Sequence, residues 1–109
     1  MQVVKAHERS FEVTPLAEKG ERVSFIAFDP KNAAWFRGRD ARGVVGYFPV
    51  GWFRIDEAGG LAEALRDYDA AELTVAVGEE IELIESFGEW CRVETGQGLG
   101  WIPVACCRS

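Results

Sequence analysis

The chain carries an internal repeat, and this feature constrains its fold more than any other. The segment Gly46–Arg54, GYFPVGWFR, aligns with Gly100–Arg108, GWIPVACCR, at an offset of 54 residues. Three landmarks recur upstream in the same order: WFR with WCR, GERV with GEEI, and VVKAH with ALRDY. Chance rarely preserves four landmarks in order, so the sequence indicates the duplication of one structural unit.

Each copy has the residue pattern of short β-strands. Residues 23–27 and 80–83 alternate with period two, which is typical of a strand that buries one face. In residues 90–93, Trp90 and Arg92 fall on one face and Cys91 and Val93 on the other. Turn-forming residues interrupt these runs, and no stretch has the pattern of an amphipathic helix. The sequence therefore predicts an all-β chain, with short strands and close turns that indicate a small barrel or sandwich.

The length of 109 residues suits one domain or two very small ones. We expect two barrels, residues 1–57 and 61–109, joined by a short glycine-containing linker at 58–60 within the polar segment Asp56–Gly60. A barrel of about 50 residues is marginally stable alone. We therefore expect the two barrels to form one rigid unit.

The overall composition argues against several classes of protein. Apolar residues make up 48% and charged residues 28% of the chain, so disorder is not expected. No run of about 18 apolar residues occurs, and no apolar stretch follows the charged start MQVVKAHERS. We expect a cytoplasmic protein with no membrane segment. The net charge of −6 disfavours nucleic acid as a partner, because phosphates require a basic surface.

Cysteine and histidine content argues against a metal site, a disulfide framework and catalysis. Cys91, Cys106 and Cys107 are odd in number and lack the paired spacing of zinc ligands. We expect free thiols buried at strand positions, and no cofactor. His7 is the only histidine, and no nucleophile motif such as G-x-S-x-G accompanies it. The sequence therefore favours a non-enzymatic protein.

The second copy resembles a Src-homology-3 domain. Residues 64–70, ALRDYDA, resemble the opening ALYDY motif of that family. ELTV at 72–75 with GE at 78–79, GEW at 88–90 and GWIP at 100–103 resemble its later motifs in order. The first copy is more divergent and keeps KGE at 19–21, Trp35 and GYFP at 46–49. The arrangement resembles small bacterial proteins with two variant domains, and it implies two five-stranded, partly open barrels in tandem.

In this family, proline-rich peptides lie in shallow aromatic grooves whose acidic rims pair with a basic residue of the peptide. Arg66 and Cys106 stand where the family has tyrosines, and the loop between Tyr68 and Leu73 is shorter than usual. Matched position by position, the resemblance implies ligand-binding side chains in both copies: Trp35, Tyr47, Pro49 and Trp52 in the first, and Tyr68, Glu72, Glu85, Glu89, Trp90, Trp101 and Pro103 in the second.

We therefore expect a non-catalytic protein–protein interaction module that binds extended or proline-containing peptides. Residues 1–57 carry a net charge of +1 and residues 58–109 a net charge of −7, which favours a basic peptide in the second groove. The alternative is a structural or assembly protein whose barrels occlude each other's grooves, with Trp52 and Trp101 contacting the other barrel instead of a ligand. We expect a monomer or a weak homodimer.

Overall fold

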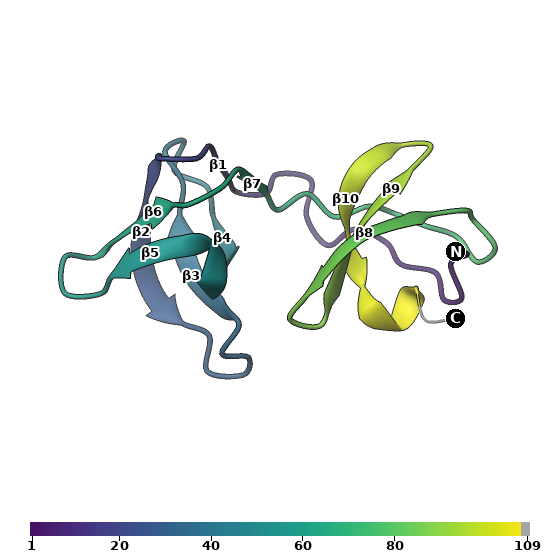
Figure 1. Ribbon diagram of the computed structural model, residues 1–109, viewed down its shortest axis with the longest axis horizontal. Coiled ribbons are helices and arrows are strands. Elements are labelled where there is room, and N and C mark those ends of the chain that lie inside the picture. The colour runs from purple at the N-terminus through teal and green to yellow at the C-terminus, as the bar shows by residue number, and fades with distance from the viewer. Residues whose placement is uncertain (108–109) are drawn as a thin grey trace. The chain divides into compact units, whose positions relative to one another are not determined.

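The chain is all-β. Residues 1–107, which the computed structural model describes, form ten β-strands and two short 3₁₀ helices, η1 and η2 (Figure 1). Within these residues, no helix is long and apolar enough to cross a lipid bilayer, and none of the three sheets closes into a barrel. The residues divide into two compact units. We call residues 13–70 the contiguous unit, and residues 1–12 together with 71–107 the split unit.

The contiguous unit contains an antiparallel sheet of five strands in the order β4-β3-β2-β6-β5. These strands are β2 (Arg22–Phe28), β3 (Trp35–Arg39), β4 (Val45–Pro49), β5 (Phe53–Asp56) and β6 (Leu61–Ala64), with η1 (Val50–Trp52) between β4 and β5. A second, two-stranded sheet pairs β1 (Leu16–Ala17) with β7 (Tyr68–Asp69).

The split unit contains a three-stranded antiparallel sheet in the order β10-β9-β8. Its elements are β8 (Glu82–Phe87), β9 (Trp90–Thr95), β10 (Gly98–Pro103) and η2 (Val104–Cys106). The first residues of the chain join this unit through two isolated antiparallel bridges, Gln2 with Glu80 and His7 with Val75. Residues from opposite ends of the sequence thus complete one unit.

The two units repeat one hydrogen-bonding pattern, but their opening segments are exchanged. We call VVKAH (3–7) and ALRDY (64–68) the opening segments, and the rest of each copy its body. In the contiguous unit, the Ala64 N–H donates to the Glu21 carbonyl at 2.9 Å. In the split unit, the Val3 N–H donates to the Glu79 carbonyl at 2.9 Å. Ala64 and Val3 occupy the same position of the repeat, so the opening segment of each copy completes the body of the other.

The expected linker at 58–60 lies in the turn of a hairpin. Strand β5 pairs with β6 in a register that sets Phe53 opposite Ala64 and Asp56 opposite Leu61. Gly60 has φ +68°, a conformation that glycine adopts without strain, and the Gly59 N–H donates to the Asp56 carboxylate. The compact units consequently divide at 12/13 and 70/71, and not at the predicted boundaries 1–57 and 61–109.

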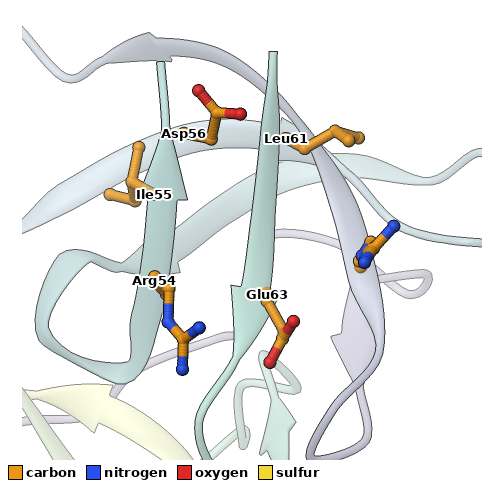
Figure 2. A pocket seen from close by; sticks show the side chains of 6 residues that line it. Arg54, Ile55, Asp56, Leu61 and Glu63 are labelled. Carbon is orange, nitrogen blue, oxygen red and sulfur yellow. The ribbon is translucent and has the colours of Figure 1, made fainter. Parts of the chain in front are cut away.

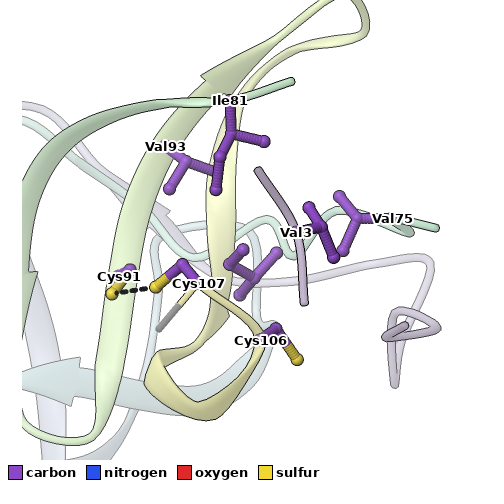
Figure 3. Packing of buried hydrophobic residues seen from close by; sticks show 8 residues of the cluster. Val3, Val75, Ile81, Cys91, Val93, Cys106 and Cys107 are labelled. Atoms are coloured by element: carbon purple, nitrogen blue, oxygen red, sulfur yellow. Dashed lines mark hydrogen bonds between the residues drawn. The ribbon is translucent and has the colours of Figure 1, made fainter. Parts of the chain in front are cut away.

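The two units have different cores on equivalent backbone positions. In the contiguous unit, Phe36 and Phe48 stack at 5.3 Å between ring centroids, and Phe53 packs edge-on against both at 5.4 Å. The equivalent positions of the split unit hold smaller side chains, Cys91, Ile102 and Cys107. Figure 3 shows the cluster that they form with Val3, Val75, Ile81, Val93 and Cys106. All three cysteines are buried, as the sequence predicted, but only Cys91 lies at a strand position, since Cys106 ends η2 and Cys107 follows it.

The predicted alternation of strand faces is confirmed in β9, where Cys91 and Val93 are buried and Trp90 and Arg92 are half-buried. It is confirmed only in part of β2, where Val23 is buried but Ala27 is exposed. The pairing of β2 with β3 shifts register between residues 25 and 27, and the pairing of β8 with β9 shifts at the equivalent residues 83–85. A bulge reverses which side chains face the core, so period two does not persist through it.

Asp40 connects the turn after β3 to the start of β1. Its carboxylate accepts hydrogen bonds from the backbone N–H groups of Leu16, Arg42 and Val44 and from the Arg42 guanidinium, all between 2.8 and 3.1 Å. Burial by itself raises the pKa of Asp40, but these hydrogen bonds together outweigh it and hold the pKa below its ordinary value of 3.8. The ionised carboxylate is therefore the stabilising form.

The exchanged opening segments predict which fragments fold. Residues 13–70 alone should give a cooperative unfolding transition, because every partner in that unit is present. Residues 71–109 alone should stay largely unfolded, because they lack Val3, which pairs with Glu79, and His7, which pairs with Val75. Adding a peptide of residues 1–12 should restore structure, which circular dichroism and amide exchange would measure. A peptide of residues 61–70 is the matched control, and equal rescue by that peptide would contradict the assignment.

Replacement of Asp40 should destabilise the contiguous unit. We expect Asp40→Asn to lower the free energy of unfolding by about 2 kcal/mol at pH 7, because four donors lose an ionised acceptor. The deficit should shrink as pH falls below 3.8 and through the lowered pKa, where the wild-type carboxylate also becomes neutral. Urea unfolding at several pH values measures this, with Asp29→Asn as the control. Equal deficits at pH 7 for both variants would contradict the role given to Asp40.

Candidate functional site

A half-buried tryptophan begins strand β9 of the split unit. Trp90 follows the two-residue turn Gly88-Glu89, in which Gly88 has φ +60° at the position where such hairpins favour glycine. The register sets Trp90 opposite Pro103 at the end of β10. The Val104 N–H donates to the Glu89 carbonyl at 2.9 Å, which joins the turn to η2. Trp90 and Pro103 therefore lie side by side on adjacent strands.

His7, from the exchanged opening segment, lies at the edge of this pair. Its ring meets the Trp90 ring edge-on, with centroids 5.9 Å apart and planes at 84°. Backbone hydrogen bonds in both directions with Val75 fix its position. We call His7, Glu89, Trp90 and Pro103 the Trp90 surface. His7 occupies the position of Tyr68 in the repeat, and the expected barrel 1–57 would have placed it with the first copy.

Glu72 holds His7 in place. Its Oε1 lies 2.9 Å from the His7 Nε2, and both side chains are mostly buried. The same oxygen accepts hydrogen bonds from the N–H and hydroxyl of Ser10 at 3.3 and 3.2 Å. Glu72 was predicted to contact ligand, but in this structure its carboxylate binds groups of the chain itself. It orients one edge of the Trp90 surface.

The two remaining predicted carboxylates have different surroundings. Glu85 receives a hydrogen bond from the Arg92 guanidinium at 3.2 Å, so an internal cation offsets part of its charge. Glu89 is exposed in the turn next to Trp90. In the sequence, residues 1–12 and 71–109 carry nine Asp/Glu against four Lys/Arg, a net of −5, and residues 13–70 carry nine against eight, a net of −1. Negative charge is therefore concentrated in the unit that presents Trp90.

Trp101 is a buried structural residue of the split unit. Only 3% of it is exposed. Its N–H donates to the Ala71 carbonyl and its carbonyl accepts from the Leu73 N–H, at 2.9 and 3.0 Å. These bonds attach the segment after the unit boundary to β10. The structure therefore places Trp101 close to Pro103 in the chain but not on the exposed part of this surface.

The predicted residues of the contiguous unit are mostly buried. Trp35, Pro49 and Trp52 are buried, whereas Tyr47 is half-exposed. Tyr68, which was assigned to the second groove, belongs to this unit. Its hydroxyl donates to the Tyr47 carbonyl at 2.9 Å, and its ring packs edge-on against Trp52. Tyr68 is thus not brought into the same unit as Trp90, because its opening segment is exchanged.

Arg66 covers Trp52. Its guanidinium carbon lies 3.6 Å from the centroid of a Trp52 ring, which is close cation–π stacking. In the equivalent positions of the split unit stand Lys5 and Cys106, so that unit has no counterpart of this pair. The aromatic face that the resemblance assigned to a ligand is therefore occupied by a cation of the same unit.

A shallow hollow of about 320 Å³ lies over strands β2, β5 and β6. Figure 2 shows Arg54 and Asp56 on one strand and Leu61 and Glu63 on its neighbour. Glu63 lies opposite Arg22 on one side and Arg54 on the other in the strand registers. Cross-strand charge alternation of this kind stabilises a solvent-facing sheet, and it accounts for these residues without a ligand.

Comparison with known protein families, with curated proteins and with solved structures finds no match. Among residues 1–107, no three His, Cys, Asp or Glu side chains gather as metal ligands would.

The Arg66–Trp52 stack predicts a measurable change in the contiguous unit. Arg66→Ala should lower the free energy of unfolding by about 1 kcal/mol, because the stacked cation is lost. It should also expose Trp52 to an added fluorescence quencher. Arg37→Ala, which removes an exposed arginine of the same unit, is the matched control. Unchanged stability and unchanged quenching for Arg66→Ala would contradict a structural role for the stack.

Proposed function

We propose that the chain is a tandem pair of Src-homology-3-like domains that acts as a non-catalytic protein–protein interaction module. In this proposal the split unit binds a basic, extended or proline-containing peptide at the Trp90 surface. The observation that carries the proposal is the half-buried Trp90 beside Pro103, with the His7 ring at its edge and Glu89 exposed next to it.

The chemistry of this surface suits such a peptide. The flat faces of a tryptophan and a proline accept the apolar ridge of a polyproline II helix, which loses little conformational entropy on binding because it is preformed. Glu89 and the net negative charge of the unit attract an Arg or Lys that flanks the prolines. An arginine over Trp90 would add a cation–π contact of about 0.5–2 kcal/mol.

We assign the contiguous unit a structural role within the same module. Burial of Trp35, Trp52 and Tyr68 supports this assignment, as does the Arg66 guanidinium over Trp52. Those contacts leave Tyr47 as the half-exposed aromatic among the predicted groove residues of this unit. The module would then bind its peptide through the split unit, while the contiguous unit has a structural role.

Peptide binding tests the proposal directly. Calorimetry at low salt should detect a peptide with two prolines and a flanking arginine, and Trp90→Ala should weaken binding about tenfold or more. Glu89→Gln should weaken it less, and raising salt to about 0.5 M should reduce affinity because exposed charges are screened. Phe11→Ala and Glu82→Gln, which alter exposed residues of the same unit outside the surface, are the matched controls.

Two results would contradict the proposal. If acidic and basic peptides bind equally well, the negative charge of the split unit does not select the peptide. If Trp90→Ala binds the peptide with unchanged affinity, the Trp90 surface is not the binding site. If neither basic, neutral nor acidic peptides bind, the alternative of a purely structural or assembly protein is favoured.

A further inference from the structure

Two cysteines occupy a contact that two phenylalanines make in the other copy. In the contiguous unit, the rings of Phe36 and Phe53 meet edge-on with centroids 5.4 Å apart. The equivalent residues of the split unit are Cys91 in β9 and Cys107 directly after η2. Their sulfur atoms are 2.6 Å apart. The repeat has thus kept the contact between these two positions and changed its chemistry from aromatic to sulfur.

The geometry separates this pair from the third cysteine. Cys91 and Cys107 are 1% and 4% exposed, and Figure 3 shows their sulfurs facing each other. The side chain of Cys106 points away from them in the same view. The separation of the paired sulfurs exceeds a disulfide bond length by only about 0.5 Å. A bond between them therefore needs little movement of either element.

We propose that Cys91 and Cys107 form a disulfide that fastens the end of η2 to strand β9. The oxidant is a small disulfide, RSSR. One cysteine thiolate attacks it, which forms a mixed disulfide and releases one RS⁻. The second cysteine thiolate attacks the mixed disulfide, which forms the Cys91–Cys107 bond and releases the second RS⁻. The two cysteines lose two protons and two electrons in total, and RSSR is reduced to two RSH.

Burial determines when this reaction takes place. Burial, together with the neighbouring Cys91, raises the pKa of Cys107 to about 12, so the folded unit holds it as an unreactive thiol. When the unit is open, both thiols are solvated and regain ordinary reactivity. The redox state is therefore set during folding or local opening, and it is then retained by the closed core.

A disulfide would stabilise the split unit, whose core is small. Cys91, Ile102 and Cys107 replace three phenylalanines, so less apolar surface is buried at these positions than in the other unit. Domains with small cores are commonly stabilised by disulfides. Crosslinking residues 91 and 107 restricts the unfolded chain between them, and most of the stabilisation arises there.

The test uses the full chain refolded with and without oxidised glutathione as RSSR. The Cys106→Ala variant, which keeps the proposed pair, should lose 2 Da and both free thiols on oxidation. Trypsin should then release peptides 67–92 and 93–108 joined by a bond that a reductant cleaves. The oxidised variant should unfold roughly 5–15 °C above its reduced form, as expected for a disulfide in a small domain. Wild type should retain one free thiol.

Specific results would overturn the proposal. Oxidised Cys106→Ala with two free thiols, or an oxidised form that unfolds at or below the reduced midpoint, would do so. In wild type, a loss of 2 Da confined to peptide 93–108 would show that Cys106 pairs with Cys107 instead. The Cys107→Ser variant should form no link between the two peptides. If Cys107→Ser fails to fold, the tryptic peptides of oxidised wild type and Cys106→Ala still show whether Cys91 and Cys107 are joined.

Discussion

Each body of the repeat leaves backbone groups unpaired until the opening segment of the other copy bonds to them. Ala64 bonds to Glu21 in one unit, and Val3 bonds to Glu79 in the other. Both residues are also buried, so the same segments supply hydrogen bonds and core contacts. Backbone groups that are buried without partners cost folding free energy. The sheets, the cores and the position of His7 all depend on this exchange.

The duplicated backbone carries two different sets of side chains. The contiguous unit has an aromatic core, a tyrosine anchored to Tyr47 and an arginine stacked on Trp52. The split unit has an aliphatic and sulfur core, and a histidine held by Glu72 at the tyrosine position. The two units thus share a backbone pattern but differ in their core and surface side chains. This difference explains why equivalent positions, such as Trp35 and Trp90, differ in exposure.

The sequence was sufficient to predict the features that depend on local pattern. The all-β class, the faces of β9 and the burial of the cysteines follow from period two and residue size. The partner of each opening segment could not be predicted, because VVKAH and ALRDY occupy the same position of the repeat and their pattern does not say which body each one completes. The partner of Glu72 inside the unit is His7, which belongs to an opening segment. Without the partner of that segment, the Glu72 carboxylate was assigned to a ligand. The proposed peptide, and the resemblance that suggests it, rest on motifs alone.

Synthesis from the N-terminus gives the split unit an unusual history. Residues 13–70 are complete once Ala70 has been added, whereas the backbone partners of Val3, Val4 and His7 are added later, from Val75 to Cys106. At about 5–20 residues per second, the ribosome needs roughly 2–7 s to add the intervening residues. During that interval Val3 and its neighbours have no body to complete. Residues 1–12 are therefore made before residues 13–70 but take their native place after them.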